Sequence, residues 1–453
     1  MGISVSITDF GAKCDGTVQT DKIQSAIDYC YLQGGGEVMV PEGIFVTGGL
    51  RIRSDVTLHL MEGACIKGTR NPLDYFGYLK DELQPLDPNE VFSGRWKRAS
   101  ERTREDFGFI TKSGSRWNNA LIRAIHAQNV AIIGEKNSCI DGSNCYDSSG
   151  EEYYRGPHAI SMHFCENIIL KGYTVKDSSN WAHNINSGKN ILMDKVKVKA
   201  GHDGAHFTLC DNIKVSDCEF YTGDDCIAGF SNLNVYVSGC MLNSACSALR
   251  FGGTNVLIEK CRMYGPCKYL FRGSLTLEEK IEGSDPVLAG HRNNMLSAFT
   301  YYADFSVPIA HDPQNITIKD CKIENADRFL HYNFSGNEPW QKGSPLLNIR
   351  FENIKASGIS MPLTAYGDKD TKVSVEFKNV DFSFREGYEE TSFMHLCFYK
   401  KVIINNVTIT NAKSNPLIKT WSDGDIEIEN LKCDVPEESL IKRATEDFKC
   451  LAI

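Results

Sequence analysis

The chain has 453 residues and a net charge of −9, with 42% apolar and 24% charged residues. This balance excludes a disordered, collagen-like or low-complexity chain, and no apolar run reaches the roughly 18 residues that a membrane span requires. The acidic excess argues against nucleic acid as the main partner.

The first predicted element is a short amphipathic helix over residues 21–33. Its apolar residues recur at helical spacing on one face, and three glycines at 34–36 end it. The predicted inward residues are Ile23, Ala26, Ile27, Cys30 and Tyr31. Because little else in the chain has helical periodicity, we expect this helix to cap a structure built from strands.

The cysteines and the opening residues suggest a compartment. The 17 cysteines are odd in number, so they cannot all pair. Residues 1–12 have neither the basic segment nor the apolar run of a secretory signal. We therefore expect a cytoplasmic protein whose cysteines are reduced and mostly buried as small apolar residues. The strand-like segments contain Cys165, Cys210, Cys218, Cys226, Cys240, Cys261 and Cys321.

The middle of the chain repeats a unit that begins with Asn and a β-branched residue. Unit starts lie at Asn167, Asn190, Asn212, Asn234 and Asn255, which are 23, 22, 22 and 21 residues apart. Each unit alternates apolar and polar residues in short pieces separated by turns, which is typical of strands. Since one such unit cannot bury a face alone, stacked copies are expected. The fold class predicted is all-β: a right-handed parallel β-helix with a short N-terminal capping helix.

Two segments interrupt the repeat, so the prediction is one β-helix domain over 1–453 with insertions at about 73–128 and 274–312. The first insertion holds a basic run in RWKRASERTRED (95–106). This run is either a solvated helix face or a lid that closes one end of a binding groove and attracts an anionic sugar. Its cations are Arg95, Lys97, Arg98, Arg102 and Arg104.

Three acidic residues are spaced by about one unit of the repeat. Asp224 and Asp225 follow Asp203 by 21 and 22 residues, which is about one coil. They should therefore lie on adjacent coils at nearly the same angular position, about one or two strand spacings apart. Close carboxylates repel one another and separate their pKa values. Glycoside hydrolysis requires such a set, with one protonated acid and one ionised base.

The chain resembles family 28 glycoside hydrolases, the polygalacturonase-like enzymes, and more widely the pectin-lyase-like β-helix proteins. The opening ITDFGAKCDG (7–16) and residues 155–198 are similar to that family, HDG (202–204) stands where the family has Asn-Thr-Asp-Gly, and GDD (223–225) stands where it has its Asp pair. The resemblance implies that Asp224 is the general acid and that Asp203 and Asp225 hold and activate the water. It also implies inversion of the anomeric centre in one step, without metal or cofactor.

The chain departs from the family pattern on the coils that follow. The family's Gly-His-Gly is replaced by SACSALRFGG (244–253), so Cys246 or Ser247 occupies the place of the histidine. His202 is a candidate to supply an imidazole instead, or is simply an exposed turn residue. The family's Arg-Ile-Lys has no full match.

The remaining substrate-binding candidates are two arginines and a tryptophan. Arg250 alternates with inward Leu249, so it should point outward toward the acids. Arg272, in the presumed strand KYLFRG (268–273), falls near the place of the family's Arg-Ile-Lys. Both arginines are candidates to bind a substrate carboxylate, or they neutralise the acid cluster. Trp181 is a candidate to stack on a sugar, or it packs between coils.

We therefore expect an inverting, exo-acting glycosidase that acts on galacturonide-like plant cell-wall oligosaccharides, with no nucleic-acid or membrane partner; its oligomeric state is left open. A polysaccharide lyase or uronate epimerase is the first alternative, in which the three acids would bind Ca²⁺. A non-catalytic carbohydrate-binding β-helix is the second.

Overall fold

The computed structural model describes residues 2–76, 116–150, 154–281, 291, 293–304, 311–336 and 341–448. The basic run predicted as a lid lies outside these residues. Among them, no helix combines the length and the apolar character needed to cross a membrane.

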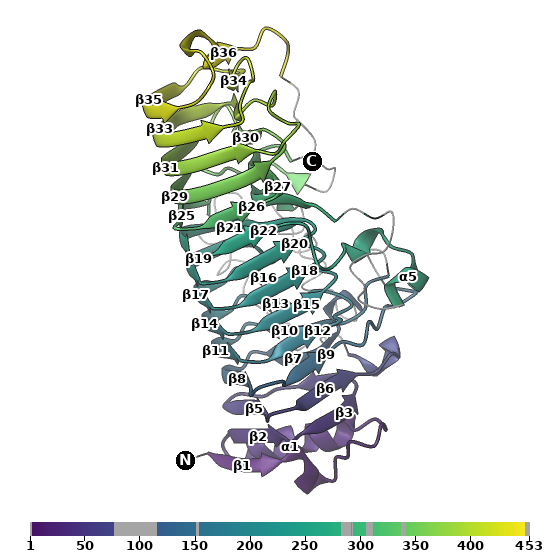
Figure 1. Ribbon diagram of the computed structural model, residues 1–453. Helices are drawn as coiled ribbons and strands as arrows, with labels where there is room; N and C mark the ends of the chain where they lie inside the picture. Colours follow the sequence, from purple (N-terminus) through teal and green to yellow (C-terminus); the bar gives the residue numbers. More distant parts are fainter. Residues whose placement is uncertain are drawn as a thin grey trace.

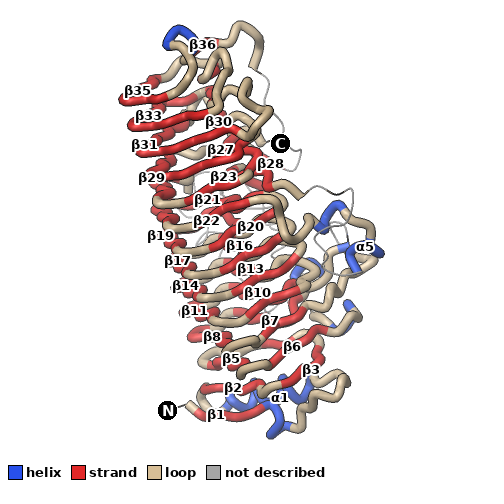
Figure 2. Tube along the Cα trace, viewed as in Figure 1, coloured by secondary structure: helices blue, strands red, loops and turns tan. Residues whose placement is uncertain are grey.

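The described strands form an elongated right-handed parallel β-helix, which confirms the predicted fold class (Figure 1). Parallel pairings run continuously from β1 to β36 and form three stacks. Some long strands run through two stacks: β29, β31, β33 and β35 pass from the first stack into the second. The stacks rise side by side along the long axis of the molecule (Figure 2).

The first stack contains the strands that begin at or near the repeated asparagines. They are β1 (Ile3–Ser6), β2 (Gly36–Val40), β5 (Val56–Leu60), β8 (Gln128–Gly134), β11 (Glu166–Lys171), β14 (Lys189–Asp194), β17 (Asp211–Ser216), β19 (Ile227–Ser238), β21 (Ser247–Glu259), β25 (Gln314–Lys319), β29 (Asn348–Ile359), β31 (Val373–Phe384), β33 (Tyr399–Thr410) and β35 (Asp425–Lys432).

The second stack follows the first along each coil. It contains β3 (Gly43–Thr47), β6 (Ala64–Gly68), β9 (Cys139–Asp141), β12 (Thr174–Lys176), β15 (Lys197–Ala200), β18 (Glu219–Thr222), β20 (Met241–Ser244), β22 (Arg262–Tyr264) and β26 (Lys322–Glu324).

The third stack precedes the first on each coil, and β19 and β21 run through both. Its other strands are β4 (Leu50–Arg51), β7 (Ala120–Ile125), β10 (His158–His163), β13 (His183–Asn186), β16 (Ala205–Thr208), β23 (Met295–Tyr301), β27 (Ala326–Asn333), β30 (Leu363–Tyr366), β32 (Met394–Cys397), β34 (Ile418–Thr420) and β36 (Ile441–Arg443). Outside the stacks, β24 (Ala303–Asp304) pairs antiparallel with β28 (Gln341–Lys342).

The helices are few and lie at the ends or edges of the stacks. In the described ranges, the α-helices are α1 (Thr20–Leu32) and α5 (Leu277–Ile281). The 3₁₀ turns are η1 (Ile7–Phe10), η2 (Pro72–Asp74), η5 (Arg116–Asn118), η6 (Arg272–Ser274) and η7 (Glu437–Ser439).

The repeated asparagines have a structural role that the repeat alone did not reveal. Asn167, Asn190, Asn212 and Asn255 all have φ between 55° and 59°, a left-handed conformation that Asn tolerates better than most residues. Their amides bond along the axis: Asn190 Nδ2 donates to Asn167 Oδ1 at 2.9 Å, and Asn212 Nδ2 donates to Asn190 Oδ1 at 2.8 Å. The β-branched residue after each asparagine points into the core, where Ile168 is fully buried.

The capping helix is present, and α1 covers the first coil at the N-terminal end (Figure 1). Four of its five predicted inward residues are buried, but Tyr31 is 45% exposed because it lies at the edge of that face. The glycine stop is required sterically: a Cβ on Gly36 would lie 2.0 Å from the Ile3 carbonyl oxygen, and Gly36 has φ of 147°.

Both predicted insertions overlap strands of the β-helix. β7 lies within the predicted 73–128 and pairs with β4 and β10. β23 lies within 274–312 and pairs with β21 and β27. The β-helix therefore resumes earlier than predicted, because β7 and β23 do not begin with the asparagine that marked the units. The seven predicted strand cysteines are all buried free thiols.

Candidate active site

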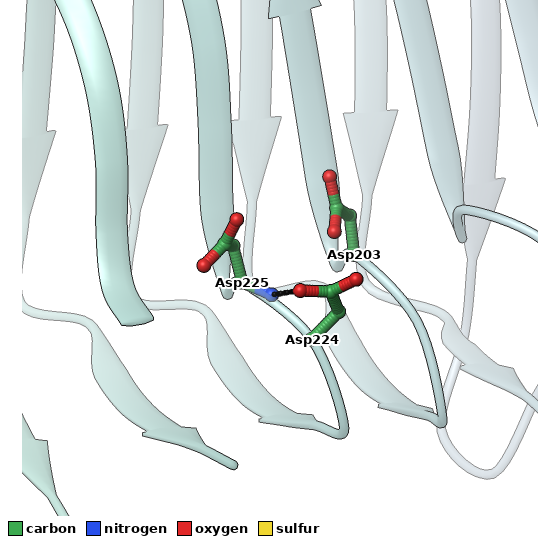
Figure 3. A group of neighbouring side chains, drawn as sticks. All are labelled: Asp203, Asp224 and Asp225. Atoms are coloured by element: carbon green, nitrogen blue, oxygen red, sulfur yellow. Dashed lines mark hydrogen bonds between the residues drawn. The ribbon is translucent and has the colours of Figure 1, made fainter. Parts of the chain in front are cut away.

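The three aspartates lie in turns that lead from the second stack into the third. Asp203 is in the turn between β15 and β16, and Asp224 and Asp225 are in the next turn along the axis, between β18 and β19. Gly204 N donates to Asp225 O at 2.9 Å, a contact between the two turns. Oxygen atoms of the three carboxyl groups all lie within 4.8 Å of one another, as predicted from the coil length (Figure 3).

The position of Asp224 depends on the preceding residue, Gly223. A Cβ on Gly223 would lie 1.8 Å from the Leu270 carbonyl oxygen and 2.5 Å from that of Gly201. Only glycine allows this close backbone approach. The Thr222 hydroxyl then donates to the Asp224 carbonyl at 2.7 Å and fixes the turn.

The three acids differ in exposure. Side chains of Asp203 and Asp225 are 1% and 5% exposed, whereas that of Asp224 is 18% exposed. Figure 3 shows the Asp224 carboxylate between Asp225 and Asp203, where it accepts a hydrogen bond from the Asp225 backbone N–H at 3.1 Å. Asp224 is therefore the acid most accessible to a substrate.

Arg250 joins the two buried acids. Its Nε lies 2.5 Å from Asp225 Oδ2 and its Nη2 lies 3.3 Å from Asp203 Oδ2. The guanidinium also lies over the rings of Phe230 and Tyr302, at 5.0 and 5.6 Å from their centroids. The expected outward direction of Arg250 is confirmed. Of its two predicted roles, these contacts match neutralisation of the acid cluster.

A histidine that sequence reasoning missed completes the surroundings of Asp203. His206 Nδ1 lies 2.9 Å from Asp203 Oδ2. The Trp181 ring stacks on the His206 ring at 3.8 Å and 12°. One face of Trp181 is thus used for packing, although the residue is only half-buried. The spacing HDGAH was the available signal, since Asp203 and His206 flank the turn.

The surroundings separate the proton affinities of the acids. Burial, reinforced by the negative charges of Asp203 and Asp225, raises the pKa of Asp224 well above its usual value. Burial raises the pKa of Asp203 to about 7, against the opposing effect of Arg250. At neutral pH, Asp224 is therefore suited to hold a proton.

His202 is not an exposed turn residue. It is fully buried, its Nε2 lies 3.2 Å from the Tyr146 hydroxyl, and burial keeps its pKa well below the usual value. His202 therefore contacts Tyr146, and it lies beside Asp203 on the coil before Asp224.

Arg272 does not contact the three acids, and the prediction that it lies in a strand is wrong. Residues 272–274 form the 3₁₀ turn η6, whose arginine donates from Nη1 to the Lys280 carbonyl at 2.6 Å. Arg272 also packs its methylene groups over Gly201, where a Cβ would meet them at 2.2 Å. Through the bond to Lys280, Arg272 holds α5 against the β-helix.

Arg155 is a further cation that sequence reasoning missed. Its Nη2 lies 4.0 Å from Asp224 Oδ2, and its Nη1 donates to Asn180 Oδ1 at 3.1 Å. Arg155 lies in the loop before β10, three coils ahead of Asp224. The two residues are 69 positions apart, about three repeat units, so the spacing was a signal that sequence reasoning did not use.

Cys246 and Ser247, the two candidates for the place of the family's histidine, lie on the coil after Asp224. Cys226 N donates to Ser247 O at 3.0 Å, which brings these two turns side by side. The backbone N–H of Cys246 donates to the Ser244 hydroxyl at 2.7 Å, and its side chain is half-buried.

Comparison with known sequences supports the resemblance. Residues 102–246 match the model of glycosyl hydrolases family 28. An exo-poly-alpha-D-galacturonosidase of Dickeya chrysanthemi is 25% identical over 255 residues, covering 49% of this chain and 41% of the relative. A probable polygalacturonase of Vitis vinifera is 26% identical, covering 51% of this chain and 45% of the relative. The chain thus spans less than half the length of these curated relatives.

Solved structures agree on the fold. A family 28 exopolygalacturonase of Yersinia enterocolitica superposes with a TM-score of 0.61 at 18% identity, covering 95% of this chain and 78% of that one. The exopolygalacturonase of Thermotoga maritima gives 0.64 at 16% identity, covering 95% and 91%. Residues 102–246 of the chain are similar to the family 28 glycoside hydrolases, and the chain has the β-helix fold of the two exopolygalacturonases.

Proposed function

We propose that the protein is a glycosidase that hydrolyses galacturonide-like bonds in plant cell-wall oligosaccharides. The observation that carries the proposal is the contrast within one carboxyl cluster. Asp224 is accessible and its pKa is raised, while Asp203 and Asp225 are buried and bonded to Arg250. A protonated acid beside charge-stabilised carboxylates is what glycoside hydrolysis requires.

In the proposed mechanism, Asp224 donates its proton to the leaving oxygen as the glycosidic bond breaks. Asp203 and Asp225 orient a water and accept its proton, and Arg250 holds both in place. We propose a single inverting step, following the family resemblance. One oxygen of each carboxyl group lies within 4.8 Å of the others, an approach closer than the roughly 6.5–9.5 Å between the two carboxyl groups of most inverting enzymes. The anomer released, read by proton NMR in the first minutes, decides this point.

The exo mode is also part of the proposal. It draws on the named activity of the relatives from Dickeya chrysanthemi and Yersinia enterocolitica. We further propose that the protein works in the reducing cytoplasm, supported by free thiols at the described cysteines.

The two alternatives receive less support. A Ca²⁺-dependent lyase or epimerase would need the oxygens of the acid cluster for its cation, but Arg250 already bonds to Asp203 and Asp225. Binding without catalysis would not require the raised pKa of Asp224. The β-helix alone does not exclude it, because a surface adhesin of Streptococcus pneumoniae shares the fold with a TM-score of 0.52.

One assay separates the three functions. The protein is incubated with polygalacturonate, and new reducing ends and absorbance near 235 nm, where an unsaturated uronide absorbs, are followed together. Hydrolysis gives reducing ends without absorbance and is unaffected by a chelator. Absorbance that disappears with chelator and returns with Ca²⁺ would instead establish a lyase, and no product at all would favour a binding protein.

A further inference from the structure

Two cysteines of adjacent coils meet on the outer side of the second stack. Cys65 in β6 and Cys139 in β9 are direct partners in the parallel pairing of these two strands (Figure 1). Their Sγ atoms lie 2.7 Å apart. Since Ile66 and Ile140 are fully buried in the core, the alternation along each strand turns both thiols outward. The two thiols therefore face each other away from the core.

The backbone of this pair already has a spacing that suits a disulfide. Neighbouring strands lie about 4.8 Å apart, and the Cα atoms of disulfide-bonded cysteines are usually about 4.4–6.8 Å apart. A covalent S–S bond is about 2.05 Å long, so the two sulfur atoms need to approach by less than 1 Å from their present 2.7 Å. Rotation of the side chains can supply this movement without a rearrangement of the coils.

Charged neighbours influence which of the two thiols ionises first. Lys176 Nζ lies 3.1 Å and Lys67 Nζ lies 4.0 Å from Asp141 Oδ2, on the same face of the stack as the thiols. The hydrogen bond with Cys65 lowers the pKa of the Cys139 thiol, and both lysines add to this effect, while burial and Asp141 oppose it. The thiolate is the nucleophilic form of cysteine. Cys139 is also the more accessible thiol, because it is half-buried and Cys65 is only 7% exposed.

Other thiols of the second stack are closed to solvent. Four of them directly precede or begin its later strands, and each is at most 4% exposed. Each also donates from Sγ to the backbone carbonyl two residues earlier, at 3.1–3.4 Å. These residues are Cys218, Cys240, Cys261 and Cys321. An oxidant in solution therefore reaches Cys139 before it reaches this set.

We propose that Cys65 and Cys139 form a reversible oxidation site, at which hydrogen peroxide produces a disulfide between the coils of β6 and β9. The Cys139 thiolate attacks one peroxide oxygen, so that an S–O bond forms and the O–O bond breaks. The hydroxide that leaves takes up the proton released by Cys139 and becomes water. Cys65 then attacks the sulfur of the sulfenic acid, the S–S bond forms, the S–O bond breaks and a second water leaves. Two thiols are oxidised, and one peroxide is reduced to two waters.

The disulfide would join two strands whose cysteines are 74 residues apart in the chain. Closing so long a loop lowers the entropy of the unfolded chain and stabilises the folded coils. Because Cys139 is accessible to solvent, a thiol reductant can reverse the bond, as is usual for exposed disulfides. Oxidation of this pair does not depend on glycosidase activity, since none of the three acids takes part.

Peptide mapping of the oxidised protein tests the site without any substitution. The protein is treated with hydrogen peroxide, its remaining thiols are alkylated in denaturant, and tryptic peptides are compared by mass spectrometry with and without dithiothreitol. We expect the peptide of Cys65 to be linked to the peptide of Cys139, at a mass two hydrogens below the sum of the free peptides, and the link to disappear with dithiothreitol. Alkylation of both cysteines, a sulfinic acid at Cys139 without the link, or a link from Cys139 to another cysteine would overturn the proposal.

Non-reducing gels provide a second measurement. A closed loop of 74 residues makes the denatured chain more compact, so the oxidised protein should migrate faster than the reduced protein. Cys65→Ser and Cys139→Ser should each abolish the faster band, whereas Cys14→Ser, the matched control at an exposed free thiol, should retain it. A faster band that persists in Cys65→Ser and Cys139→Ser, or that is lost in Cys14→Ser, would assign the cross-link to other cysteines and reject the pair. If a serine variant does not fold, the peptide map of the native protein still decides.

Discussion

Three residues of one type have different properties in this site because their neighbours differ. Asp203 and Asp225 share Arg250, and Asp203 also contacts His206. Asp224 is partly exposed, and its ion-pair contact within the described residues is with the more distant Arg155. Its environment, and not its residue type, makes it the candidate proton donor.

Replacement of Asp224 by Asn should remove the proton donor and preserve the shape of the turn. We expect kcat on oligogalacturonides to fall by about 10²- to 10⁴-fold, the usual contribution of general acid catalysis. The loss should be smaller on a 4-nitrophenyl glycoside, whose leaving group needs little protonation. Asp217→Asn, at an exposed turn one coil segment away, is the control; near-native kcat in a folded Asp224→Asn protein would reject the assignment.

The same substitution should affect stability in a pH-dependent way. The pKa of Asp224 is raised in the folded protein, so the folded state binds this proton more tightly than the unfolded chain, whose Asp pKa is near ~3.9. The stability that this proton contributes to the folded state is complete below the unfolded pKa and is lost as pH rises through the folded pKa. In scans between about pH 4 and pH 8, the Tm of Asp224→Asn should therefore increase relative to that of the native protein as pH rises.

Calorimetric scans across this pH range measure the difference. A Tm difference that stays constant with pH would mean that Asp224 does not titrate in the folded state between pH 4 and pH 8.

At the scale of the elements, the coils depend on an asparagine series that runs along one edge of the first stack. Asn190 both donates to Asn167 and accepts from Asn212, at 2.9 and 2.8 Å, with φ of 55°. Each such residue combines a left-handed backbone with two bonds between coils. The register of the turns that carry the acids depends on this stacking.

Asn190→Ala and Asn190→Gly should separate these two contributions. Alanine loses both hydrogen bonds and must adopt left-handed φ, which adds roughly 1–2 kcal/mol, whereas glycine loses only the bonds. We expect Ala to lower the free energy of unfolding by about 2–3 kcal/mol and Gly by about 1 kcal/mol. Chemical denaturation measures both free energies of unfolding, with the exposed Lys189→Ala as a neutral control. Equal effects of Ala and Gly would show that the left-handed φ at residue 190 adds no cost for alanine.

At the scale of the whole molecule, three stacks of strands run along one axis (Figure 1), and the acids lie in turns between the second and third stacks. The carboxyl cluster lies in the middle coils, so strands extend well beyond it in both directions. A surface of this length can hold a polymer unless a segment of the chain closes one end of it. The predicted lid at 95–106 lies outside the described residues, and exo action remains a proposal.

A product time course on polygalacturonate tests that proposal. A closed groove admits only a chain end, so monosaccharide should be released from the first minutes while the viscosity of the solution falls slowly. Chromatography and viscometry on the same samples provide both readings. Early loss of viscosity, with monosaccharide appearing late, would show internal cleavage and an open groove.

The spacing of the repeat predicts how the coils of this protein stack. A unit of about 22 residues fixes the axial register of a solenoid, so the stacking of the Asn190 and Asn212 turns, the burial of Ile168 and the meeting of Asp203 with Asp225 all followed from spacing. The capping helix followed from its own local pattern. Where the unit start was absent, as at β7 and β23, the strands were missed.

Which charges meet depends on how the coils pack. Arg155 and Tyr146 reach Asp224 and His202 from loops, His206 reaches Asp203 from β16, and Arg272 lies in η6, where it bonds to the end of α5. Side chains in loops are not constrained by the repeat, and their direction depends on the packing of residues far apart in the chain. The same packing buries Asp203 and raises the pKa of Asp224, because desolvation and the sum of nearby charges arise only when the coils are assembled.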